Sequence, residues 1–175
     1  MTKIKLTKGE LKRQRDALRQ YERYLPTLQL KKQQLQLEIL QQAAILAEKD
    51  QLKAKKDEAV KTWIVLLAEN NIDLKAWILP SKIVTGSKNV AGTDIPVFEA
   101  VEFQDAEYDL FSTPFWSDFA IDALRSLVSI REEIKVIEKG INILRHELRI
   151  ASQRVNLFEK VKIPEAREAI RRIKI

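Results

Sequence analysis

The sequence predicts a mainly α-helical protein, a long antiparallel two-helix coiled coil with a small central subdomain made of a β-hairpin and short helices. Apolar residues recur every three or four positions in both halves of the chain. Only 4 Gly and 5 Pro occur among 175 residues, and β-branched and aromatic residues gather in the middle. We therefore expect an N-terminal helix over residues 1–70, the central subdomain over 71–116 and a C-terminal helix over 117–175.

The N-terminal segment carries a heptad repeat, in which apolar residues alternate at steps of three and four. The positions that face a partner helix are called the seam, and here they include Leu11, Leu18 and Leu25. Pro26 lacks a backbone donor, so we expect the helix to bend there. Asn70 and Asn71 predict the end of the helix.

The same segment also has apolar residues outside the seam. They are Leu30, Leu37, Ala44, Ile45 and Leu52. These residues widen the apolar surface beyond the stripe that a single partner helix can cover. The sequence therefore predicts a second neighbour for this part of the helix.

The C-terminal segment has the most regular repeat in the chain, without a polar exception. Its seam positions are Leu127, Ile130, Ile134, Ile137, Ile141, Leu144, Leu148, Ala151, Val155 and Phe158. Ser117, directly before Asp118, predicts an N-cap. Beyond Phe158 the repeat shifts by one residue to Ile163, beside Pro164, which predicts a kink or a local irregularity.

The two helical segments have similar lengths, about 90 Å each at about 1.5 Å per residue. Each has a seam that must be buried, and the segment between them is compact enough to return the chain. Antiparallel pairing within the chain is the simplest arrangement that buries both seams.

The middle of the chain has two stretches that read as β-strands, residues 82–85 and 95–103. Residues 86–94 between them are rich in turn formers, so the sequence predicts a β-hairpin. Most of the aromatic residues near this end of the coiled coil are expected to form a small core beneath the hairpin, and some could instead anchor a partner. They are Trp63, Trp77, Phe98, Phe103, Phe111, Phe115, Trp116 and Phe119.

The net charge of +6 is distributed unevenly. Residues 1–62 carry +7, residues 63–117 carry −5 and residues 118–175 carry +4. Antiparallel pairing would bring together basic residues from the two ends of the chain, which we call the basic tip. Its members include Lys8, Lys12, Arg13, Arg167, Arg171 and Arg172. This tip is either a solvated helical face or a surface for a nucleic acid or an acidic protein.

The sequence offers no residues for catalysis, for a metal or for a cofactor. It contains no Cys, no Gly-rich phosphate loop and no nucleophile elbow, and its one histidine, His146, lies beside the seam. The start of the chain lacks the apolar core of a signal peptide, and the longest apolar run, residues 63–68, is too short to span a bilayer. We therefore expect a soluble, non-enzymatic protein.

Three motifs give the chain a resemblance to the D subunit of V-type and archaeal-type rotary ATPases. Residues 88–96 resemble that family's hairpin signature, N-hydrophobic-x-G-x-x-(I/V)-P. Residues 154–164 resemble its motif R-V-N-A-L-E-x-x-x-I-P, with Leu157 and Phe158 in place of Ala and Leu. Thr7-Lys8 and Leu30-Lys31 resemble the N-terminal pattern, with Gln33 where a basic residue is common.

The resemblance implies a central-stalk rotor that couples ATP hydrolysis or synthesis to proton or sodium transport. The coiled coil would be a shaft inside an alternating hexamer of catalytic A and B subunits, and the basic tip would face that hexamer. The rotor would have no catalytic site and no cofactor, and would lie peripherally at the cytoplasmic face of a membrane, without inserting into it. The family also implies a further helical stretch beyond Ile175.

The same resemblance implies that the hairpin holds the small F subunit of the stalk and faces the C/d-type subunit that couples to the membrane ring. The hairpin residues expected to form this interface are Lys88, Asn89, Val90, Ile95, Pro96 and Phe98. The alternative is a free-standing basic coiled-coil protein that binds nucleic acid through its basic tip. Aromatic side chains that could stack on bases are scarce there, being Tyr21 and Tyr24, which disfavours single-strand binding.

Overall fold

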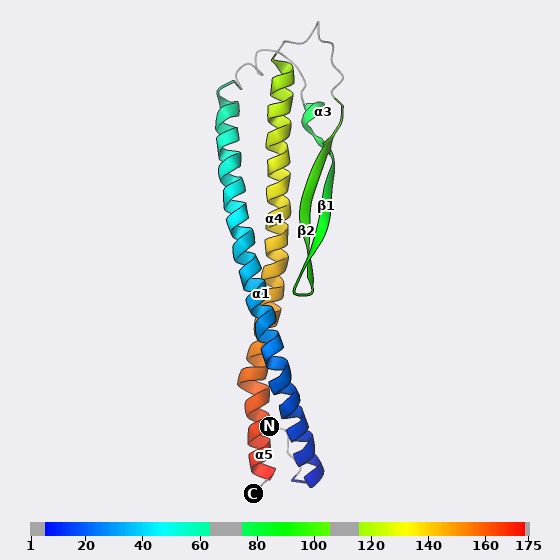
Figure 1. Ribbon diagram of the computed structural model, residues 1–175, viewed down its shortest axis with the longest axis vertical. Helices are drawn as coiled ribbons and strands as arrows, with labels where there is room; N and C mark the ends of the chain where they lie inside the picture. Colours follow the sequence, from blue (N-terminus) through cyan, green and yellow to red (C-terminus); the bar gives the residue numbers. More distant parts are fainter. Residues whose placement is uncertain (1–5, 64–74, 106–115, 174–175) are drawn as a thin grey trace. The chain divides into compact units, whose positions relative to one another are not determined.

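The computed structural model describes residues 6–63, 75–105 and 116–173, and it confirms the expected fold class, with two long helices and a small antiparallel hairpin (Figure 1). The elements, in chain order, are α1 (Lys8–Lys61), α3 (Lys75–Ile78), β1 (Pro80–Val90), β2 (Thr93–Phe103), α4 (Ser117–Leu157), the π-helical turn η1 (Phe158–Lys162) and α5 (Ile163–Ile173). They form two compact units. The first unit comprises Met1–Glu38 and Leu144–Ile175, and the second comprises Ile39–Ile143.

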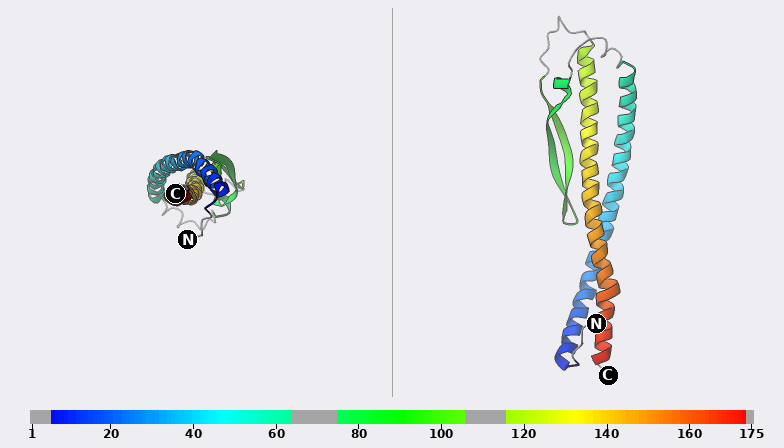
Figure 2. Two further views of the ribbon diagram at one scale, coloured as in Figure 1. Left: turned by 90° about the horizontal axis from the view of Figure 1, so that it is seen from below. Right: turned by 180° about the vertical axis from the view of Figure 1, so that it is seen from behind.

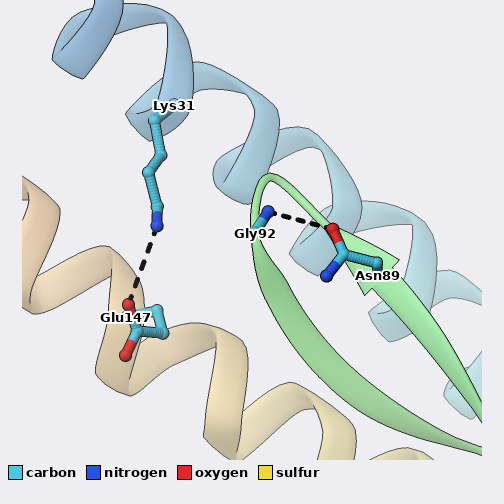
Figure 3. A network of polar contacts seen from close by, with 4 residues as sticks. All are labelled: Lys31, Asn89, Gly92 and Glu147. Carbon is cyan, nitrogen blue, oxygen red and sulfur yellow. Dashed lines mark hydrogen bonds and ion pairs between the residues drawn. The ribbon is translucent and has the colours of Figure 1, made fainter.

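In the first unit, the start of α1 lies antiparallel to the chain from the end of α4 through α5. Glu22 pairs with Arg167 at 2.9 Å, and Lys31 pairs with Glu147 at 3.9 Å (Figure 3). The number of the paired residue falls from 167 to 147 as the position on α1 advances from 22 to 31, which is the signature of antiparallel helices. The centre of this unit is apolar, with Leu35 and Leu144 completely buried.

The shift of the heptad repeat near Pro164 corresponds to a π-helical turn. The backbone N–H of Ile163 donates to the carbonyl of Phe158, five residues earlier, which accommodates one more residue than an α-helical turn. Because of this extra residue, Ile163 and Ala166 stay buried on the seam side although the repeat has shifted. The predicted irregularity is therefore confirmed, and its form is a widened turn that keeps the seam continuous.

In the second unit, the later part of α1 lies antiparallel to the first part of α4. Lys49 pairs with Glu133 at 2.8 Å, and Asp57 pairs with Arg131 at 3.8 Å. Val60 of α1 is buried, as are four seam residues of α4. These four are Leu127, Ile130, Ile134 and Ile141.

The first long helix is shorter than the sequence predicted. Helix α1 ends at Lys61, before the predicted Asn70–Asn71. The Thr62 hydroxyl donates to the Ala59 carbonyl at 2.7 Å, and such local side-chain bonds compete with a continuing helix. The predicted end at residues 70–71 lies outside the described residues.

Ser117 is the first residue of α4 and does not act as its N-cap. The first backbone bond runs from Ala120 N–H to the Trp116 carbonyl, at 3.0 Å, so the cap position falls on Trp116. The Ser117 hydroxyl is buried and has no hydrogen-bond partner among the described residues. The carboxylate of Asp118 does lie in the first turn, as expected.

The hairpin strands are longer than the sequence predicted, because the turn uses only Ala91 and Gly92. Both residues have positive φ, 50° and 78°, as a two-residue type I′ turn requires. Asn89 stabilises the turn, since its Oδ1 accepts from the Gly92 N–H at 3.1 Å (Figure 3) and its Nδ2 donates to Asp94 at 2.6 Å. The other turn formers of residues 86–94 lie within the strands, where pairing with the opposite strand overrides their local preference.

The hairpin lies alongside the first part of α4 (Figure 1). Ile95 and Val90 are buried, and a Cβ atom on Gly140 would lie 3.8 Å from both the Ile95 Cβ and the Pro96 carbonyl oxygen. A methyl group would therefore fit at position 140, whereas a larger side chain would press against β2. A small aliphatic contact anchors the hairpin.

The predicted aromatic core is therefore wrong for the residues that the structure describes. Phe119 is 69% exposed and only meets Trp63 edge to face, at 6.3 Å between ring centroids. Trp77, Phe98, Phe103 and Trp116 are half-buried, while Phe111 and Phe115 lie outside the described residues. The contact with Gly140 is made by Ile95 and Pro96 and by none of these aromatic residues.

Arg125 of α4 holds the base of the hairpin by several contacts. Its guanidinium donates to the Trp77 carbonyl at 2.9 Å and to the Gln104 carbonyl at 2.5 Å. It also lies over the Phe103 ring, 5.3 Å from the centroid, in a cation–π geometry. One side chain thus joins the segments on both sides of the hairpin to α4.

Candidate functional site

The described residues contain no cluster of three or more His, Asp or Glu side chains that could hold a metal ion. His146 is exposed on α4. None of the helices in the described ranges is both long enough and apolar enough to cross a membrane. Three surfaces of the described part of the chain are candidate functional features.

The first surface is the hairpin, where the six predicted interface residues divide between two faces. Successive side chains of a strand point to opposite faces, so Val90 and Ile95 are buried toward α4 while Asn89 is exposed. Lys88 is exposed, and Pro96 and Phe98 are half-buried. Substitution of Val90 or Ile95 would therefore disturb how the hairpin packs on α4, while the exposed members can be reached by a partner.

The second surface is the basic tip in the first unit. All six of its named residues are exposed, and α5 lies beside the start of α1 in Figure 1 and Figure 2. Two of the six are paired, Arg167 with Glu22 at 2.9 Å and Arg172 with Glu168 at 3.0 Å. Each of these exposed ion pairs stabilises the fold by only about 0–1 kcal/mol, so the two arginine side chains are held weakly.

The third surface is the apolar stripe of α1, which consists of large side chains left exposed beside the paired helices. In the first unit these are Leu30 and Leu37, at 54% and 60% exposure. In the second unit they are Leu40, Ile45 and Leu52. Ala44 is also exposed. At about 3.6 residues per turn, Ile45 and Leu52 fall on a flank beside the seam of α1, whereas the other four positions fall roughly opposite it. The antiparallel partner helix therefore leaves all six positions exposed.

Leu40 belongs to this stripe although the sequence pattern did not single it out, and the structure shows it 69% exposed. The signal was available, because Leu40 lies three residues after Leu37 and so falls on a neighbouring part of the same helix face.

The seam residues named from the sequence are covered to different degrees. Leu127, Ile134, Ile141 and Val155 are buried, while Leu148 and Phe158 are half-buried. On α1, Leu11, Leu18 and Leu25 are only half-buried. Near the basic tip, Tyr21 and Phe158 meet edge to face with ring centroids 5.3 Å apart. The seam is thus most completely covered along the first part of α4.

Comparisons with known proteins agree with this architecture. A family model described as the D subunit of ATP synthase matches residues 10–175. The chain is 45% identical to a protein named as the D subunit of V-type ATP synthase from Borreliella burgdorferi, over 100% of this chain and 86% of the relative.

Two proteins of the same name from other bacteria are also similar. The chain is 31% identical to that of Chlamydia pneumoniae, over 98% of this chain and 83% of the relative. It is 33% identical to that of Chlamydia caviae, over 99% and 85%. The nucleic-acid alternative finds no support in these comparisons.

Proposed function

Because this chain belongs to the family of ATP synthase D subunits, we propose that it is the central-stalk rotor of a V-type rotary ATPase. In this role it has no catalytic site of its own and couples ATP hydrolysis or synthesis in a catalytic hexamer to ion transport. The observation that carries the proposal is the match over residues 10–175, together with two long helices that pack antiparallel in both units.

The paired helices suit the transmission of torque. A single helix twists and bends readily, whereas two helices joined by a packed seam must disrupt buried contacts in order to twist. In the second unit the seam residues of α4 are buried, and ion pairs connect the helices across the seam. This is the mechanical property that a rotating stalk requires.

The basic tip, in this proposal, faces the catalytic A and B subunits. Its exposed arginines and lysines are suited to acidic side chains on a surrounding ring of subunits. Contacts of this kind are weak individually and are screened by salt, so they can be exchanged as the stalk turns.

The other two surfaces would serve partners in the stalk. The hairpin contacts the small F subunit and faces the C/d-type subunit that couples to the membrane ring. The apolar stripe of α1 suits an additional helix, since its members recur at roughly heptad spacing. The rotor would lie peripherally at the cytoplasmic face of the membrane.

The test is reconstitution of the complete ATPase in ion-tight vesicles with and without this chain. We expect ATP hydrolysis to drive ion uptake only when the chain is present, and we expect the isolated chain not to hydrolyse ATP. Normal ion uptake by a complex that lacks the chain would overturn the proposal, as would hydrolysis by the chain alone.

A further inference from the structure

The hairpin is attached to α4 at two separate places. Near the turn, the buried Ile95 lies beside Gly140. At the base, Arg125 donates to the Trp77 carbonyl at 2.9 Å and to the Gln104 carbonyl at 2.5 Å. From position 125 to position 140 the helix rises by about 22 Å, at about 1.5 Å per residue. One attachment would let the hairpin pivot on α4, whereas two attachments this far apart fix its direction.

The pairing of the strands is least regular in the half of the hairpin that Arg125 holds. Both register shifts lie there, one between Pro80 and Lys82 and the other between Val84 and Thr85. From Thr85 to the turn, the pairing continues without a shift. A register shift leaves a residue unpaired and interrupts the backbone hydrogen bonds, and a two-stranded hairpin is only marginally stable by itself. The base of the hairpin therefore depends on contacts from outside its own strands.

The contacts of Arg125 require the shape of a guanidinium group. Its Nε donates to the Trp77 carbonyl, its Nη2 donates to the Gln104 carbonyl, and the group lies 5.3 Å from the centroid of the Phe103 ring. Arginine makes such contacts together because its donors are held in one plane, and that plane can lie on an aromatic ring. A lysine ammonium keeps the charge but lacks this planar set of donors. The charge alone is therefore not enough to hold both segments.

The residue after Arg125 connects α4 to the other long helix. The Nζ of Lys56 in α1 donates to the hydroxyl of Ser126. Consecutive residues of α4 thus bond to the base of the hairpin and to α1. A force applied to the hairpin would therefore reach both long helices of the second unit at this level.

We propose that Arg125 is a positioning residue for torque transmission, which holds the hairpin in a fixed direction on α4 so that load on the hairpin reaches the paired helices. This inference rests on the proposed function, in which the hairpin contacts the F subunit and faces the C/d-type subunit. Without the guanidinium, the hairpin would still be held at Ile95, but its base would move under load. Arg125 acts through the hairpin in this role.

Hydrogen–deuterium exchange in the full chain tests whether Arg125 holds the base. Arg125→Lys keeps the charge and the helix propensity, so the fold is retained. Arg149→Lys is the matched control, because Arg149 is exposed on the same helix and has no hydrogen bond or ion pair within the described ranges. Loss of one charge-assisted bond should make exchange in residues 80–85 and 98–103 about tenfold faster in Arg125→Lys than in the control.

Exchange along α4 should be the same in both variants, because the seam of that helix is unchanged. Equal exchange at the hairpin base in the two variants would overturn the inference. Faster exchange throughout α4 in Arg125→Lys would also overturn it, since the residue would then stabilise the whole unit and not the hairpin in particular.

The assembled complex in ion-tight vesicles tests the transmission of torque. We expect complexes with Arg125→Lys to transport fewer ions per ATP hydrolysed than complexes with Arg149→Lys. This ratio does not depend on the amount of complex present, so a lower yield of folded chain would leave it unchanged. Equal ratios for the two variants would overturn the inference and leave the proposed function intact. Absence of ATP-driven ion uptake with the unmodified chain would instead overturn the proposed function.

Discussion

At the scale of single residues, glycine at position 140 determines how closely the hairpin can approach α4. A Cβ there would meet the Ile95 Cβ and the Pro96 oxygen at 3.8 Å, an ordinary van der Waals distance. The position therefore has room for a methyl group and for nothing larger. Gly140 is in the middle of a long helix, where glycine is intrinsically unfavourable.

This geometry predicts opposite effects for two substitutions. Gly140→Ala should increase the free energy of unfolding by about 0.5–1 kcal/mol, because alanine favours the helix and its methyl group fits. Gly140→Leu should decrease it by about 1–3 kcal/mol, because its larger side chain forces β2 away from α4. Urea unfolding followed by circular dichroism measures both. A destabilising Gly140→Ala would show that the space beside Pro96 is smaller than the structure indicates.

At the scale of elements, the π-helical turn η1 keeps the seam buried although the heptad repeat shifts. The heptad repeat ends at Phe158 and resumes at Ile163, five residues later, where an α-helical repeat takes a step of three or four. Pro164 also lacks the N–H that an α-helix would use. A turn with an i to i+5 bond accommodates the extra residue and brings Ile163 back to the buried side.

The turn predicts that one residue can be deleted within η1 and not within α4. Deletion of the exposed Lys160, combined with Pro164→Ala, should convert η1 to a regular helical turn and change the free energy of unfolding by no more than about 1 kcal/mol. Deletion of the exposed Arg149 from the regular part of α4 is the control. It should cost about 3 kcal/mol or more, because every later seam residue moves off the buried side. Thermal unfolding compares the two, and equal losses would contradict the role assigned to η1.

At the scale of the whole molecule, the chain leaves large apolar side chains exposed on α1 that its own fold does not cover. Isolated exposed leucines are common, but several on one helix face indicate a binding surface. In the proposed function, a partner in the assembled complex would cover these side chains and recover the cost of exposing them. The stability of the free chain and its ability to assemble should therefore depend on different residues.

A pair of substitutions in the second unit tests this separation. Leu40→Gln with Ile45→Gln should change the free energy of unfolding of the free chain by less than about 1 kcal/mol, because both side chains are exposed. The same variant should incorporate poorly into the complex, measured by co-purification. Ile134→Ala is the control, since substitution of this buried residue should lower the stability by about 2–5 kcal/mol. Normal incorporation of the double variant would contradict a role for the stripe.

The sequence by itself determined the two long helices and their seams, because apolar residues recur every three or four positions along both helices. It also determined the position of the irregularity before α5, because the repeat shifts there beside Pro164. It also located the hairpin and, through three motifs, the family. The apolar residues outside the seam of α1 already predicted a second neighbour. These features are local, so periodicity and turn chemistry are sufficient to reveal them.

The tertiary structure alone decided the features that depend on contacts between distant residues. The strands extend through residues 86–89 because the opposite strand pairs with this whole stretch and supplies backbone hydrogen bonds at Gly86 and Lys88. Most of the aromatic residues were expected in a core, but those that the structure describes are half-buried or exposed, and the contact with Gly140 is made by the buried Ile95. No local pattern encodes these features, because each arises from the pairing of segments that are far apart in the sequence.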